Sequence, residues 1–154
     1  MRAIKRISSF LLIAVTETYE YTDIIKLNDR QKMNKTIMIV DDEQSCHDLY
    51  EMMLRNTDYE IISVYDGVEA LTKLDEKKPD LMIIDIILDM MTGDTLFLYL
   101  KSMPRYDDIP VIMASNHSSH YYKSLREIDP ALVFLDKIHT TGERLIKEIK
   151  AKIG

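Results

Sequence analysis

The chain has 154 residues, enough for one hydrophobic core of ordinary size, which excludes a large multidomain enzyme. Hydrophobic residues make up 46% and charged residues 30%, values of a folded globular domain rather than of a disordered chain. The net charge of -6 argues against nucleic-acid binding by phosphate neutralisation, and a single cysteine excludes an internal disulfide and a multi-cysteine zinc site. This cysteine usage favours a cytoplasmic protein.

The first 35 residues differ in charge from the rest of the chain. They carry seven basic and four acidic side chains, a net charge of +3, which leaves -9 for residues 36–154. The basic start and the apolar run at 10–15 are similar to a secretion signal, but no small-residue cleavage site follows. The run is also shorter than the roughly 20 apolar residues of a membrane span. We therefore treat 1–35 as an N-terminal extension that packs on the domain or on a partner; a natural start at Met33 fits equally well.

From residue 36 onward, short β-branched runs alternate with longer segments that have helical spacing. We expect strands and helices to alternate, in chain order, at 36–40, 44–56, 60–64, 67–77, 81–84, 94–103, 109–114, 117–128, 131–135 and 140–153. Strands joined through helices require crossover connections, which make a sheet parallel and cover both of its faces. The prediction is an open, doubly wound α/β domain with five parallel strands.

Polar side chains follow four of these strands, at the edge where doubly wound sheets bind ligands. Asp41 and Asp42 follow the first strand, Asp85 the third, Ser115 the fourth and Lys137 the fifth. Carboxylates crowded together repel one another unless a cation neutralises them, and oxygen ligands with retained waters suit Mg²⁺. The chain has no glycine-rich phosphate loop. A phosphate at this edge would therefore be delivered by another molecule.

The segments around these residues resemble the response-regulator receiver domains of two-component signalling, the CheY-like superfamily, over about residues 36–154. The matching segments are Ile-Val-Asp-Asp-Glu at 39–43, Pro-Asp-Leu-Met-Ile-Ile-Asp at 79–85 with Gly93 eight positions later, Ile-Pro-Val-Ile-Met-Ala-Ser at 109–115, and Phe-Leu-Asp-Lys at 134–137. Each match alone is weak, but the order and spacing of all four are specific. The resemblance implies a flavodoxin-like sheet with strand order 2-1-3-4-5.

The resemblance also implies a phosphoacceptor and a magnesium site. Asp85 would take the phosphoryl group from a phosphohistidine on a sensor histidine kinase or a histidine phosphotransfer protein. Asp42, Asp85 and the carbonyl oxygen of Ile87 would bind Mg²⁺ directly, and Asp41 would act through a water. Lys137 would neutralise charge on the phosphoryl oxygens.

A conformational switch is the remaining implied feature. Ser115 would donate a hydrogen bond to the phosphoryl group, and the ring of Phe134 would turn inward behind it; without a phenolic hydroxyl, Phe134 should favour the inward position. The protein would then be a stand-alone receiver rather than a conventional enzyme. Its signal would reach a downstream protein by contact or by onward transfer of the phosphate, with a weak homodimer left open.

Several residues depart from the family pattern, and two of them replace a proline close to the predicted site. Asp89 and Ile138 both stand where the family has proline, in the second case commonly with a cis bond. We expect either a trans 137–138 peptide in a rebuilt loop or a strained cis peptide. These departures motivate a second hypothesis, a receiver-like module that binds partners without phosphorylation. A phosphatase of the haloacid dehalogenase type is disfavoured, because Ile87 stands where a second catalytic aspartate is needed.

Ordinary roles are predicted for the cysteine, the histidines and several acidic side chains. Cys46 is expected to be a small buried hydrophobe, and Glu43, Asp89 and Asp94 solvated charges. The histidines lack metal-ligand spacing, so we expect exposed or partly packed imidazoles at His47, His117, His120 and His139.

Overall fold

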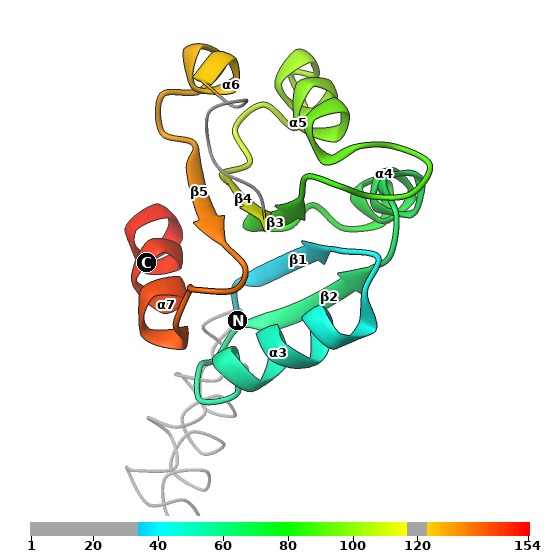
Figure 1. The fold of residues 1–154 in the computed structure, drawn as a ribbon. Coiled ribbons are helices and arrows are strands. Elements are labelled where there is room, and N and C mark those ends of the chain that lie inside the picture. Colours follow the sequence, from blue (N-terminus) through cyan, green and yellow to red (C-terminus); the bar gives the residue numbers. More distant parts are fainter. Residues whose placement is uncertain (1–33, 117–122) are drawn as a thin grey trace, which may run out of the picture. The chain divides into compact units, whose positions relative to one another are not determined.

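The computed structural model describes residues 34–116 and 123–154, and within them the predicted parallel sheet is confirmed (Figure 1). Its strand order is β2-β1-β3-β4-β5, as the resemblance implies. The strands are β1 (Thr36–Val40), β2 (Glu60–Val64), β3 (Leu81–Asp85), β4 (Val111–Ser115) and β5 (Val133–Asp136). Predictions for residues 1–33, for the first half of the fourth helix, and for His117 and His120 lie outside the described residues.

Helices cover both faces of the sheet. On one face, a buried apolar cluster joins the sheet to α3 (Gln44–Leu54) and α7 (Gly142–Ile153), and these two helices pack against each other. On the other face, a second cluster joins the sheet to α4 (Gly67–Glu76), α5 (Gly93–Ser102) and α6 (Lys123–Ile128). Alternate strand residues feed the two clusters, as the pleat requires. In the part of the chain described here, no helix combines the length and apolarity needed to span a bilayer.

Most observed element ends lie within two residues of the predicted ones, some inside and some outside them, and two of the later starts have a local chemical cause. Helix α7 begins at Gly142 rather than 140, because the Thr141 hydroxyl accepts a hydrogen bond from the backbone N–H of Arg144 at 3.3 Å. Strand β4 begins at Val111 rather than 109, because Pro110 has no N–H to donate to a neighbouring strand.

The register brings the predicted site residues to one edge of the sheet. Val40 is paired with Ile84, and the last residue of β3, Asp85, is paired with Ala114 of β4. Since parallel strands end at the same edge, the side chains that follow β1, β3, β4 and β5 converge there.

Candidate functional site

Three carboxylates meet at the carboxyl edge of the sheet. One oxygen each of Asp41, Asp42 and Asp85 lies within 4.8 Å of the other two. Asp41 and Asp85 are 1% and 8% exposed, whereas Asp42 is exposed. The structure thus brings together the carboxylates that the strand ends predicted. Such a set of hard oxygen donors, open to solvent on one side, fits a magnesium ion.

Lys137 extends from the end of β5 into this cluster. Its Nζ lies 2.6 Å from Oδ2 of Asp41 and 2.6 Å from Oδ2 of Asp85. Burial alone would lower the pKa of the lysine, but hydrogen bonds and charge from the two carboxylates outweigh burial and raise it above its ordinary value. Three carboxylates and one ammonium leave a net charge of about -2, which a divalent cation would neutralise.

Asp85 is held on both of its oxygens. Lys137 Nζ contacts Oδ2, and the backbone N–H of Ile87 donates to Oδ1 at 3.3 Å. Burial raises the pKa of the Asp85 carboxyl, and the hydrogen bond and charge of Lys137 only partly oppose this. The side chain therefore presents a desolvated, oriented carboxylate, which suits nucleophilic attack.

The connection after β3 forms a tight turn in place of the family proline. The N–H of Met91 donates to the carbonyl oxygen of Asp89 at 2.7 Å, and Met90 between them has a left-handed backbone with φ of 66°. Asp89 is exposed, as predicted, and Asp94 is half-buried. Ile87, proposed as a carbonyl ligand, lies at the start of this connection with its side chain exposed.

Ser115 and Phe134 lie on neighbouring strands. Ser115 ends β4, is 5% exposed, and accepts the backbone N–H of Lys137 on its carbonyl oxygen at 3.1 Å. Phe134, opposite Met113, is half-buried against the cluster that includes α4 and α5, and its ring centroid lies 5.1 Å from the Arg126 guanidinium carbon. The two candidate switch residues thus lie on adjacent strands, and Ser115 is the one that contacts the backbone of Lys137.

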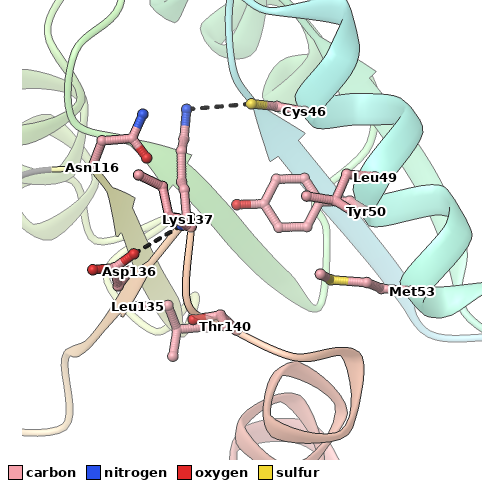
Figure 2. A pocket seen from close by; sticks show the side chains of 10 residues that line it. Cys46, Leu49, Tyr50, Met53, Asn116, Leu135, Asp136, Lys137 and Thr140 are labelled. Atoms are coloured by element: carbon pink, nitrogen blue, oxygen red, sulfur yellow. Dashed lines mark hydrogen bonds between the residues drawn. The ribbon is translucent and has the colours of Figure 1, made fainter.

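The prediction for Cys46 is only partly confirmed, because this side chain packs against the core but is half-buried and also contacts the site. Its Sγ lies 3.7 Å from Nζ of Lys137 (Figure 2). The two residues line a cavity of about 190 Å³ between α3 and the β5–α7 connection, and the Tyr50 hydroxyl points toward Lys137. Burial first, and the charge of Asp41 second, raise the pKa of the Cys46 thiol to about 11. The thiol is therefore protonated at neutral pH.

The prediction for His47 is wrong. The imidazole is fully buried, and its Nε2 lies 2.7 Å from the carbonyl oxygen of Asp41. A sequence signal existed, because His47, Tyr50 and Leu54 follow one another at the spacing of a buried helix face. His139, in contrast, is exposed as predicted and pairs with Asp136 at 3.0 Å.

The Lys137–Ile138 peptide is trans, which confirms the rebuilt-loop alternative. None of the peptide bonds in the described ranges is cis. Oδ1 of Asp136 accepts the backbone N–H of Ile138 at 2.8 Å and that of His139 at 3.0 Å. The side chain of Asp136 therefore closes the loop. A proline at position 138 would remove one of its two hydrogen bonds, because proline has no backbone N–H.

Known proteins share this sequence pattern. The profile of a family described as the response regulator receiver domain matches residues 37–150. The chain is 33% identical over 93 residues to the alkaline phosphatase synthesis transcriptional regulatory protein PhoP of Bacillus subtilis. The matched segment covers 60% of this chain but only 38% of PhoP. The chain is 25% identical over 125 residues to protein PilG of Pseudomonas aeruginosa, covering 81% of this chain and 92% of PilG.

The fold is shared with solved structures as well. Chemotaxis protein CheY4 of Vibrio cholerae superposes with a TM-score of 0.69 at 25% identity, over 77% of this chain and 98% of CheY4. The family match over residues 37–150 includes the five strands, apart from the first residue of β1, and the edge on which the three carboxylates lie.

Proposed function

Because the chain belongs to the response regulator receiver domain family, we propose that it accepts a phosphoryl group on Asp85 and signals to another protein. The observation that carries the proposal is the setting of Asp85. This residue ends the central strand β3, pairs with Lys137 at 2.6 Å, and has the carboxylates of Asp41 and Asp42 within 4.8 Å.

In the proposed reaction, an oxygen of Asp85 attacks the phosphorus of a phosphohistidine on a sensor histidine kinase or a histidine phosphotransfer protein. A P–O bond forms as the P–N bond breaks, and the electron pair of that bond returns to the imidazole nitrogen. The product is an acyl phosphate. Phosphoryl transfer depends on alignment and charge neutralisation more than on covalent assistance. The contacts of Lys137 and the Ile87 N–H with Asp85 supply the alignment.

The carboxylates provide the proposed magnesium site. Asp42, Asp85 and the carbonyl oxygen of Ile87 would hold the ion, with Asp41 acting through a water. When bound, Mg²⁺ neutralises charge on the phosphoryl oxygens. The Lys137 ammonium adds a second positive charge, and the Ser115 hydroxyl donates a hydrogen bond to a phosphoryl oxygen.

The signal is proposed to leave through the face formed by α6, β5 and α7. Phe134 lies on β5 and is half-buried, so its ring can respond to a movement of Ser115 at the end of the neighbouring strand. A downstream protein or a second copy of the chain would recognise this change, or the phosphoryl group would pass to a histidine on a downstream carrier. We place the reaction in the cytoplasm, in keeping with the unpaired Cys46.

Phosphorylation by acetyl phosphate and Mg²⁺, followed by intact-mass measurement, tests the proposal. We expect the wild type to gain one phosphate that hydroxylamine removes, as it does from acyl phosphates, and Asp85→Asn to gain none. Asp89→Asn is the matched control, because it deletes an exposed carboxylate four residues away and should leave the modification intact. Phosphate on Asp85→Asn would contradict the assignment.

A second candidate is a receiver-like module that binds partners without phosphorylation. The observation in its favour is the exposure of large apolar side chains in the loops that follow Asp85 and Lys137: Ile87 is 58%, Met90 87% and Ile138 71% exposed. Such side chains are typical of a contact surface. This candidate gains support if the wild type stays unmodified with several phosphodonors and binds its partner equally well with and without Mg²⁺.

A further inference from the structure

The buried imidazole of His47 lies beside the acidic cluster and takes no part in the transfer chemistry proposed above. On α3 it shares the inward helix face with Tyr50 and Leu54, and its side chain is 0% exposed. Burying a polar ring is unfavourable unless the ring makes hydrogen bonds. A histidine in this apolar position therefore needs a hydrogen-bond partner, which an aliphatic side chain would not.

That partner is the backbone of the loop that carries two of the three carboxylates. Nε2 of His47 lies 2.7 Å from the carbonyl oxygen of Asp41. A carbonyl oxygen only accepts hydrogen bonds, so Nε2 carries the hydrogen and donates it. The carbonyl belongs to the peptide between Asp41 and Asp42, and because a peptide unit is planar, holding its oxygen sets the direction in which the chain continues to Asp42.

Tyr65, in the connection between β2 and α4, contacts the imidazole from another part of the chain. The ring centroids of His47 and Tyr65 are 4.5 Å apart at an angle of 51°, and the Tyr65 hydroxyl donates to Oε1 of Gln44 on α3 at 2.8 Å. Nδ1 of His47 is buried and, within the residues described, has no hydrogen-bond partner. The orientation of the ring therefore depends on the Nε2 hydrogen bond and on its contact with Tyr65.

We propose that His47 is a positioning residue for the metal-binding carboxylates. Its Nε2 hydrogen holds the Asp41–Asp42 peptide so that both carboxylates face Asp85. The other hydrogen bonds of Asp41 do not involve this carbonyl oxygen: its N–H donates to the carbonyl of Val64 at 3.1 Å, and its Oδ1 accepts from the N–H of Glu43 at 3.1 Å. The inference rests on the proposed magnesium-dependent function and adds a residue that touches neither metal nor phosphate.

Three variants separate positioning from packing. His47→Phe keeps a buried ring and removes the donor, whereas His47→Gln keeps an N–H at a similar reach. Leu54→Ala is the control, because it opens a cavity on the same helix face away from the loop. Two properties are measured on unphosphorylated protein: hydrogen exchange of the Glu43 amide without metal, and the affinity for Mg²⁺ by calorimetry.

We expect His47→Phe to speed exchange of the Glu43 amide and to weaken Mg²⁺ binding about tenfold, the lower end of the range for groups that orient metal ligands. His47→Gln should restore most of both properties. Leu54→Ala should lower the melting temperature while leaving Mg²⁺ affinity and Glu43 exchange at wild-type values.

The proposal is overturned if His47→Phe matches the wild type in both measurements. It is also overturned if Leu54→Ala weakens Mg²⁺ binding as much as His47→Phe does, since the effect would then follow from stability. Phosphorylation enters neither measurement, so a wild type that binds Mg²⁺ but takes no phosphate contradicts only the proposed function. If the wild type binds no Mg²⁺, exchange of the Glu43 amide decides. Unchanged exchange in His47→Phe overturns the positioning role. Faster exchange in His47→Phe, with the wild-type rate restored in His47→Gln, supports it.

Discussion

Gly93, the first residue of α5, lies directly against the backbone of the proposed phosphoacceptor. A Cβ at this position would stand 1.9 Å from the carbonyl oxygen of Asp85, and the Gly93 N–H donates to the carbonyl of Ile86 at 2.9 Å. Backbone atoms cannot rotate away as a flexible side chain can. We predict that Gly93→Ala lowers the free energy of unfolding by about 1–3 kcal/mol and weakens Mg²⁺ binding, measured by chemical denaturation and calorimetry.

Gly142, the first residue of α7, provides the control for this prediction. A Cβ there would meet Cγ of Met53 at 3.4 Å, an ordinary contact. Gly142→Ala should leave stability unchanged or raise it by up to about 1 kcal/mol, because alanine is the better helix former. An equal loss of stability in both variants would show that the close approach to Asp85 is not the cause.

At the scale of elements, the connection between β5 and α7 depends on the side chain of Asp136. Its Oδ1 accepts the N–H groups of Ile138 and His139. Ile138→Pro removes one donor, so we predict a loss of about 0.5–1.5 kcal/mol in the free energy of unfolding, measured with urea. Ile138→Ser keeps the N–H, and since the Ile138 side chain is 71% exposed, this variant should match the wild type. If both variants lost the same free energy of unfolding, the cause would be the loss of the isoleucine side chain and not of the N–H.

At the scale of the whole molecule, we propose that residues 36–154 form the receiver domain and that the N-terminal extension is separable from it. Every strand and helix described lies between Thr36 and Ile153. We predict that removal of residues 1–33 changes the melting temperature by less than about 4 °C and leaves Mg²⁺ affinity intact, as calorimetry would measure. A larger decrease would show that the extension contributes to the fold.

Much of the fold and part of the site followed from local patterns. The β-branched runs predicted all five strands because strand formation reflects short-range alternation and composition. The meeting of Asp41, Asp85 and Lys137 was also predictable, since the carboxyl ends of parallel strands share one edge. The strand order came from the family resemblance instead, because periodicity along one strand does not specify its neighbours.

The sequence by itself therefore determined the alternation of strands and helices and the acidic edge, and the candidate phosphoacceptor came from the family resemblance. Only the tertiary structure decided the environments of Cys46 and His47. The buried helix face of His47 was readable from spacing, but the neighbours of Cys46 and His47 were not, because Lys137 and Tyr65 approach them from other parts of the chain. Burial and hydrogen bonding of a polar side chain depend on such non-local packing, and this packing places a thiol beside Lys137 and an imidazole beneath the loop of Asp41 and Asp42.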